Sequence, residues 1–488
     1  MPNASSSHID LQATAKEIMR QHGFEPDFPP AVQQQLADLR AHPPQIAFGK
    51  DVRDLRNLLW SSIDNDTSRD LDQIEVAERL PNSNVKIQVG IADVDAFVHK
   101  QSAIDQHAAR ETTTVYTGVR VFPMLPEELS TGKTSLLEKQ DCLSVVTEFV
   151  VDADGNVTSS HVYRALVRNH AQLQYNSVGA WLEGAAAAPA KVAASADLQA
   201  QLRLQSEVAQ KLKNHRLEAG ALTLQTDEVS PLVLNEQVVD VVQQQKNYAT
   251  ELIEDFMIAA NGVVARMLEK VSSLRRVVKQ PERWDRIVQL AAEHGEKLPA
   301  EPDSKALNEL LVRRKAADPD HFADLSLTVI KLLGPGEYVL ERPGDPSAGH
   351  FALAVQDYTH STAPNRRFPD IVTQRLIKAM LAGQPNPYSD DELSAIAANC
   401  TAKGDAERKV EREMSKRLAA VAMQNRIGAT FDAIVTGATP KGTFVRIQQP
   451  HVEGLLVQGG QGADVGDKLR VKLIRTDVQH GYIDFARA

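Results

Sequence analysis

The sequence has few cysteines and lacks long hydrophobic runs. Cys142 and Cys400 are its two cysteines in 488 residues, and they are far apart and outside any CxxC or Cys/His pattern. We therefore expect no disulfide framework, no disulfide-linked partner and no zinc site, and we expect a reducing, cytoplasmic environment. A run of about eighteen apolar residues is absent, which argues against a membrane span. The N-terminus, MPNASSS, lacks the basic and apolar regions of a secretory signal.

Positive charge is also in the minority. The net charge is -10 and the isoelectric point is about 5.8. This balance argues against a surface coated all over with nucleic acid, although a basic channel can lie inside an acidic shell. The length is sufficient for about two or three domains.

What the sequence does contain is an acidic loop. Residues 62–73 read SIDNDTSRDLDQ, with four aspartates in nine residues: Asp64, Asp66, Asp70 and Asp72. Apolar residues precede the segment and an alternating pattern follows it, which predicts a loop between two short strands. Crowded carboxylates repel one another unless a cation lies among them, and a sparse set of oxygen ligands favours Mg²⁺ over Ca²⁺. The EF-hand glycine and closing glutamate are missing. The alternative is a solvated acidic turn.

A second stretch, far away in sequence, is basic. Residues 358–370 read YTHSTAPNRRFPD, in which Arg366 and Arg367 follow a turn-forming proline. Acidic metal ligands in one place and a paired-arginine turn in another are the two halves of a phosphoryl-transfer site.

Together these motifs resemble the ribonuclease II / ribonuclease R (RNB) family, whose motifs are I-D-x5-D-x-D-D and T-S-P-I-R-R-Y-x-D. Tyr116 and the segment FPMLPEELS at residues 122–130 are similar to the family's Y…IPMLPxxLS signature, and the motifs occur in the family's order. The resemblance implies an α+β fold, with a mixed sheet surrounded by helices. It also implies a 3′→5′ hydrolytic exoribonuclease that degrades single-stranded RNA to nucleoside 5′-monophosphates. One or two Mg²⁺ ions would be its cofactor, with Mn²⁺ as a substitute.

The same resemblance assigns the metal and catalytic residues. Asp64, Asp70 and Asp72 match the family's first three catalytic aspartates, and Gln73 stands at the position of the fourth. These four side chains are the predicted metal ligands. Arg366 matches an arginine that stabilises charge on the scissile phosphate.

Two further residues of the predicted site have alternative roles. Arg367 holds either the RNA backbone or a neighbouring carboxylate. Glu407, in the segment AERKV, resembles a glutamate that supports the family's site by orienting Arg366. Its alternative is an ordinary exposed helix charge.

Several residues are predicted to contact RNA near its 3′ end. Tyr116 matches an aromatic residue that clamps the last bases, and Tyr175 matches a tyrosine near the ribose. Glu254, on a helix predicted over residues 250–268, is either a ribose contact or a charge at the helix start. Residues 85–91 predict a half-buried strand, and Asp93 follows it. Asp93 either lies near the metals or has its carboxylate satisfied by backbone N–H groups. The family's partner phenylalanine has no counterpart, because residues 220–224 are aliphatic.

The pattern of apolar and polar residues changes after residue 428. Short alternating segments between Gly-, Pro- and Asp-containing turns predict a five-stranded OB-type barrel that resembles an S1 RNA-binding domain. Phe431 and Phe444 would form its base-stacking platform, although Phe431 is alternatively a core residue. Four basic residues are predicted to follow the phosphates: Lys441, Arg446, Lys468 and Arg470.

The remaining organisation is simpler. Residues 8–44 predict two helices, Leu11–Gln21 and Ala31–Ala41, which leave no room for the two cold-shock domains common in the family. Residues 142–168 predict strands with a hairpin turn at 152–156. The predicted domains are a helical region 1–44, an RNB catalytic domain 45–426 and an S1-like domain 427–488.

Gln73 is the reason for considering a second function. An amide in place of the family's fourth aspartate is compatible with an RNA-binding pseudoenzyme on the same fold. A metal-dependent phosphatase or DNA nuclease is a more distant alternative, which the S1-like barrel disfavours.

Overall fold

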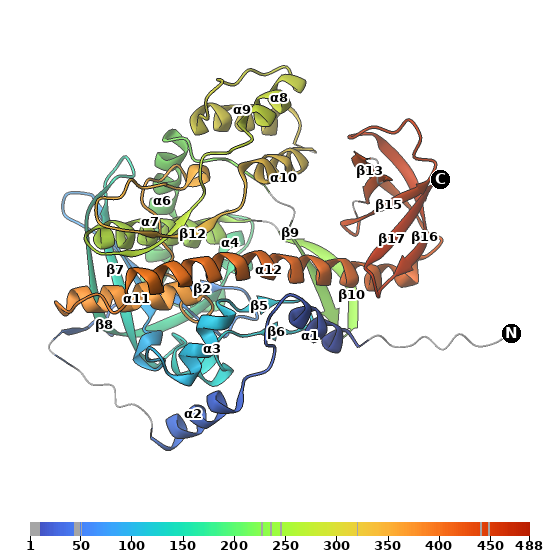
Figure 1. The fold of residues 1–488 in the computed structure, drawn as a ribbon. Coiled ribbons are helices and arrows are strands. Elements are labelled where there is room, and N and C mark those ends of the chain that lie inside the picture. The colour runs from blue at the N-terminus through green and yellow to red at the C-terminus, as the bar shows by residue number, and fades with distance from the viewer. Residues whose placement is uncertain are drawn as a thin grey trace.

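A six-stranded sheet lies at the centre of the larger part of the molecule (Figure 1). The computed structural model describes residues 10–42, 49, 51–225, 228–234, 237–244, 246–319, 321–439, 442–447 and 449–488. The strand order is β1-β8-β2-β3-β4-β7, and β8 also pairs with β7, so the sheet curls back on itself. Its strands are β1 Val52–Asp54, β2 Trp60–Asp64, β3 Gln73–Arg79, β4 Val85–Ala92, β7 Asp141–Val151 and β8 Val157–Gln174.

The two strands predicted on either side of the acidic loop are β2 and β3. They are antiparallel, with Ser61 opposite Glu75. β8 runs parallel to β2 and places Gln174 beside Asp64. The acidic loop therefore begins where the carboxyl ends of β2 and β8 lie side by side, and the predicted hairpin at residues 152–156 joins β7 to β8.

Both faces of the sheet are covered. The prediction of a half-buried strand over residues 85–91 is wrong in its burial, because Lys86 alone among the residues of β4 is not buried. The side chains at 85, 87, 89 and 91 pack in one apolar cluster with α6 and α7, while the other face of the sheet belongs to a second cluster. Gly90 is required there, since an added Cβ would lie 3.1 Å from Ile74 and 3.4 Å from the Trp60 ring.

Helices surround the sheet, as the α+β prediction requires. The segment between β4 and β7 contains η1 Val94–Ala96, α3 Ala103–Glu111, β5 Val115–Tyr116, β6 Val121–Phe122 and η2 Leu129–Lys133. After β8 come α4 Tyr175–Leu182, α5 Ala190–Ala193, α6 Ala196–Glu218, the hairpin β9 Glu228–Leu234 and β10 Gln237–Gln244, α7 Tyr248–Met267 and η3 Leu268–Lys270. Next are β11 Ser273–Val277, α8 Trp284–Glu293, α9 Ser304–Ala317, α10 Phe322–Leu333, β12 Glu337–Glu341, η4 Phe351–Leu353 and α11 Phe368–Leu381.

One long helix, α12 Asp390–Met423, connects the sheet region to the C-terminal barrel (Figure 1). Ser389 and Glu392 form a capping box at its start, which satisfies backbone N–H groups of the first turn. Its 34 residues span about 50 Å. Its last turns carry Leu418 and Met423 into the apolar core of the barrel, so the helix and the barrel share one core.

The C-terminal strands form the predicted five-stranded closed barrel, in the order β13-β14-β15-β17-β16. The short turn η5 Gln424–Arg426 precedes them, and their bounds are β13 Thr430–Thr439, β14 Gly442–Ile447, β15 Val452–Gln458, β16 Lys468–Asp477 and β17 Tyr482–Arg487.

The two predicted N-terminal helices are present as α1 Leu11–Gln21 and α2 Pro30–Ala41. α1 packs beside α12, and α2 packs beside α3. Among the described residues, no helix combines the length and the apolar character needed to cross a membrane.

Candidate active site

The acidic loop is held in a defined shape by its own side chains and by a neighbouring turn. Asp64 Oδ1 accepts hydrogen bonds from the Asn65 N–H at 2.7 Å and the Ser68 hydroxyl at 2.7 Å. The Ser135 hydroxyl donates to the Arg69 carbonyl at 2.7 Å and accepts the Leu71 N–H at 2.9 Å. These bonds anchor both halves of the loop and leave Asp66 exposed to solvent.

The arginine turn meets the acidic loop at Asp72. The Asn365 N–H donates to Asp72 Oδ1 at 2.8 Å, and the Arg366 Nε lies 3.4 Å from Asp72 Oδ2. The Asn365 side chain is fixed in turn by Thr134, whose hydroxyl donates to its carbonyl oxygen at 2.5 Å. The two motifs that the sequence separates by almost 300 residues thus form one site.

This site is poor in compensating positive charge. Asp72 is 2% exposed, and burial raises its pKa to about 7, although Arg366 and the Asn365 N–H act in the opposite direction. Burial also raises the pKa of Asp70, and the charge of Asp64 adds to that rise. Three carboxylates that share one arginine leave excess negative charge, which a divalent cation bound through oxygen ligands would balance. The chemistry of these residues suits Mg²⁺ or Mn²⁺, although their oxygens are not among the described sets of three ligand atoms that lie within 4.8 Å of one another.

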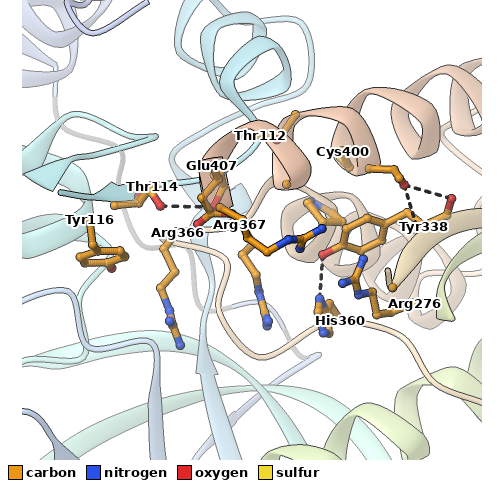
Figure 2. A pocket seen from close by; sticks show the side chains of 16 residues that line it. Thr112, Thr114, Tyr116, Arg276, Tyr338, His360, Arg366, Arg367, Cys400 and Glu407 are labelled. Atoms are coloured by element: carbon orange, nitrogen blue, oxygen red, sulfur yellow. Dashed lines mark hydrogen bonds between the residues drawn. The ribbon is translucent and has the colours of Figure 1, made fainter. Parts of the chain in front are cut away.

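A pocket of about 180 Å³ is lined by both residues of the arginine turn, Arg366 and Arg367 (Figure 2). Tyr116, Arg366 and Glu407 line one end, and Tyr338, His360 and Arg276 line the other. The Tyr116 hydroxyl lies 3.4 Å from Asp70 Oδ2, and the residue is 41% exposed. Tyr116 is thus placed beside the carboxylates and is accessible to a ligand.

Arg367 points to a carboxylate, one of the two partners predicted for it. Its Nη2 lies 2.7 Å from Oδ1 of the fully buried Asp370. Glu407 accepts a hydrogen bond from the Thr113 hydroxyl at 3.3 Å. Burial, with the charge of Glu411, raises the pKa of Glu407 to about 7. Glu407 is partly buried and lines the pocket, so it is not an ordinary exposed helix charge.

Tyr175 begins α4 directly after β8, near the acidic loop. Burial raises its pKa, and the charges of Asp64 and Glu75 add to the rise. Gln73 is buried at the start of β3, opposite Ile91. Glu75 follows on the same face of β3 and is 1% exposed, with both carboxylate oxygens unpartnered among the described residues.

Two other predicted residues have contacts away from the carboxylate loop. Glu254 is half exposed on α7 and forms an ion pair with Lys246 at 2.7 Å. Asp93 is buried, and its Oδ1 pairs with Lys378 at 2.9 Å and accepts the Ala96 N–H at 3.2 Å. Its Oδ2 has no hydrogen-bond partner among the described residues. The second predicted alternative, a strand-end carboxylate satisfied by backbone N–H groups, therefore describes Asp93 only in part.

The predicted RNA contacts of the barrel differ in their surroundings. Phe431 packs against the barrel core with its ring edge-on to Phe485, whereas Phe444 is half-buried and lies opposite Gly437, which has no side chain to cover it. Arg446 forms a two-point ion pair with Asp324 of α10, at 2.7 and 2.8 Å. Lys441 lies outside the described residues.

Sequence reasoning missed three residues that shape the site. Asn365 joins the two motifs, Ser68 fixes Asp64, and Thr113 holds Glu407. The contact of Ser68 is local, because Ser68 lies four residues after Asp64 in the acidic loop. Asn365 and Thr113 act across long sequence separations, which no local pattern reveals.

Comparison with known proteins was consistent with this geometry. The family model for the RNB domain matches residues 52–383. The family model for the RNase II-type exonuclease C-terminal S1 domain matches residues 429–488. Ribonuclease R of Thermotoga maritima is 30% identical over an alignment of 470 positions, which covers 89% of this chain and 64% of that protein. Ribonuclease R of Escherichia coli is 28% identical, with 96% of this chain and 61% of that protein covered. The chain thus spans less than two thirds of the length of these curated relatives.

Solved structures show the same fold. RNase R of Mycoplasma genitalium in complex with ribose-methylated single-stranded RNA has a TM-score of 0.86 and 23% identity, with 98% of this chain and 78% of that chain covered. The same protein has been solved with double-stranded RNA. Yeast Ssd1, described as a pseudonuclease, has a TM-score of 0.72 and 16% identity, with 96% of this chain and 59% of that chain covered.

Proposed function

Because the chain belongs to the RNB family and carries an RNase II-type S1 domain, we propose that it is a divalent-metal-dependent 3′→5′ exoribonuclease. Its substrate would be single-stranded RNA and its products nucleoside 5′-monophosphates. The observation that carries this proposal is the meeting of the two motifs at Asp72, where an aspartate and the Arg366 guanidinium share one site. RNase R of Mycoplasma genitalium binds single-stranded RNA on the same fold, which supports the substrate class.

The residues of the candidate active site would have separate roles in binding the metal, the phosphate and the 3′ end of the RNA. Asp64, Asp70, Asp72 and the Gln73 amide oxygen would hold Mg²⁺. When bound, the metal activates water and stabilises the leaving 3′-oxygen. Arg366, whose side chain is 48% exposed, would bind the scissile phosphate, while Asp72 holds its Nε side in place. The Tyr116 ring would stack on a terminal base, and Tyr175 would contact the ribose. Both roles position the 3′ end of a single strand against the carboxylates.

Gln73 favours one competing function, an RNA-binding pseudoenzyme. An amide keeps an oxygen ligand but removes a negative charge, so metal affinity should fall. Asp64, Asp70, Asp72 and Arg366 are nevertheless present together in one site. We therefore favour an active enzyme that requires more Mg²⁺ than an enzyme with four aspartates, or prefers Mn²⁺.

One experiment separates these functions. Release of mononucleotides from labelled RNA, with a DNA of the same sequence beside it, is measured across Mg²⁺ and Mn²⁺ titrations for wild type, Gln73→Asp and Asp72→Asn. We expect wild type to cleave RNA, Gln73→Asp to need less Mg²⁺, and Asp72→Asn to lose at least roughly 100-fold in rate while RNA affinity is retained. Wild type that is inert at every metal concentration, with cleavage restored in Gln73→Asp, would establish the pseudoenzyme.

A further inference from the structure

Three potential metal ligands meet far from the acidic loop, between the N-terminal segment and α3. One ligand atom each from Glu25, His107 and Glu111 lies within 4.8 Å of the other two. His107 and Glu111 are one turn apart on α3, so their side chains share a face of that helix. Glu25 belongs to the segment between α1 and α2, and its N–H donates to Glu111 Oε2 at 3.0 Å.

Two of these side chains are buried with unused polar atoms. His107 is 2% exposed and Glu111 is 4% exposed. His107 Nδ1 and Glu111 Oε1 have no hydrogen-bond partner within the part of the chain that the structure describes. Buried polar atoms are nearly always satisfied, and two that are unsatisfied at one place require an explanation. A shared ligand satisfies both.

The surroundings suit a small ligand. A cavity of about 10 Å³, the size of one water molecule or ion, is lined by all three residues together with Phe28 and Phe122. The Phe28 ring centroid lies 4.8 Å from that of His107. An apolar wall of this kind excludes bulk water from a metal and fixes the orientation of its ligands.

Two cations near the cluster have partners of their own. Arg110 pairs with Glu25 Oε2 at 2.6 Å, but both side chains are 50% exposed, and exposed pairs contribute little stability. Lys403 donates to the Gly23 carbonyl at 2.6 Å and lies 4.4 Å from the Phe24 ring centroid. Neither contact prevents Glu25 from turning an oxygen toward His107.

We propose that Glu25, His107 and Glu111 bind a divalent transition-metal ion of the Zn²⁺ class, separate from the Mg²⁺ or Mn²⁺ of the active site. One imidazole nitrogen and two carboxylates form a neutral set with Zn²⁺, whereas Mg²⁺ prefers oxygen ligands alone. Ligand bonds of roughly 2.0–2.2 Å need the three atoms only moderately closer than their present spacing. A water molecule would complete the coordination.

Such an ion would have a structural consequence for the active site. Glu111 ends α3 and leads directly into residues 112–114. There the Thr113 hydroxyl donates to Glu407, and the Thr114 N–H donates to the Arg366 carbonyl at 3.0 Å. The ion would thus fasten the N-terminal segment to residues 112–114, which support the arginine turn.

The test uses the full chain, stripped of metal by a chelator, and needs no RNA. Binding of Zn²⁺ is measured by calorimetry in excess Mg²⁺, and binding of Co²⁺ by its visible absorption bands. Wild type is compared with His107→Ala, Glu111→Gln and Asp72→Asn, and with His99→Ala as a matched control, because His99 is exposed nearby. Circular dichroism establishes that each variant is folded.

We expect one tight equivalent of Zn²⁺ in wild type, His99→Ala and Asp72→Asn, with a higher melting temperature when Zn²⁺ is bound. His107→Ala and Glu111→Gln should weaken Zn²⁺ binding at least tenfold. The proposal is overturned if wild type binds no Zn²⁺ in excess Mg²⁺, if folded Glu111→Gln binds as wild type does, or if Asp72→Asn abolishes binding. None of these readouts depends on nuclease activity, so failure of the proposed function would be seen separately.

Discussion

Asp72 is the residue at which protonation and metal binding compete. Its pKa is raised to about 7 by burial, so near and below pH 7 a proton occupies the carboxylate that the metal requires. We expect the apparent Mg²⁺ affinity to rise as pH increases through about 7, by up to roughly tenfold per pH unit below that value. Calorimetric Mg²⁺ titrations between pH 6 and 8 measure this dependence.

Glu407 supplies the control, since its pKa is also raised to about 7 by burial. Glu407→Gln removes that titration and should leave the pH dependence of Mg²⁺ affinity in place. A flat pH profile in Glu407→Gln would assign the effect to Glu407 and contradict the role of Asp72.

Glu75 is expected to make the fold sensitive to alkaline pH. Burial raises its pKa well above the ordinary value of 4.5, so the folded protein holds this proton more tightly than the unfolded chain does. Its contribution to stability is therefore complete below about pH 4.5 and is lost as pH rises toward the raised folded pKa. Glu75→Gln should be more stable than wild type at pH 8, by roughly 1–3 kcal/mol, and should show a flatter dependence of melting temperature on pH.

Glu78→Gln is the matched control, because Glu78 lies on the same strand but is exposed. It should follow the wild-type pH profile. Parallel profiles for wild type and Glu75→Gln would show that the Glu75 carboxyl does not set this dependence.

At the scale of elements, local patterns predicted most of the structure. The alternation after residue 428 identified the barrel, and the apolar spacing over residues 250–268 identified α7, which runs from Tyr248 to Met267. The burial of β4 was missed because residues 86, 88 and 90 read as a polar or neutral face. Gln88 is buried there by a hydrogen bond to the Tyr163 hydroxyl at 2.7 Å, a partner that no local pattern reveals.

Long-range pairing also explains why the roles of charged residues are harder to predict than the elements that carry them. Arg446 was predicted to follow phosphates, but its guanidinium is paired with Asp324, more than a hundred residues earlier. A phosphate at this position would have to displace that carboxylate. The aspartates of the acidic loop were easier to identify, because their mutual crowding is visible within one short segment.

The Arg446–Asp324 pair should hold the barrel against α10. Its side chains are 15% and 25% exposed, and the two-point geometry is favourable for a guanidinium and a carboxylate. In a double-mutant cycle of thermal unfolding with Arg446→Gln and Asp324→Asn, we expect a coupling free energy of about 1 kcal/mol or more. The same cycle on the exposed pair Arg470–Asp432 should give a coupling near zero. Equal couplings for the two pairs would contradict this assignment.

At the scale of the molecule, an acidic chain binds a polyanion only where local chemistry outweighs the net charge of -10. Under the proposed function two regions would supply that chemistry, the arginine-lined pocket and the aromatic face of the barrel, and α12 joins them. Because Leu418 and Met423 of α12 belong to the barrel core, deletion of the barrel would expose apolar surface and disturb the helix that carries Glu407. A point substitution on the barrel surface tests RNA binding more cleanly.

Phe444 is the position for that substitution. Its half-buried ring lies across from Gly437, so a base can stack on it, and base–aromatic stacking contributes roughly 1–3 kcal/mol. Phe444→Ala should weaken binding of an RNA long enough to reach both regions by roughly 5- to 100-fold. Hydrolysis of an oligomer too short to reach the barrel should keep its wild-type rate. Fluorescence anisotropy measures RNA binding, and mononucleotide release measures hydrolysis.

Phe431→Ala is the comparison, since Phe431 packs on the barrel core and its loss should lower the melting temperature instead. If Phe444→Ala binds long RNA as tightly as wild type, RNA does not stack on this face of the barrel and the pocket alone accounts for binding.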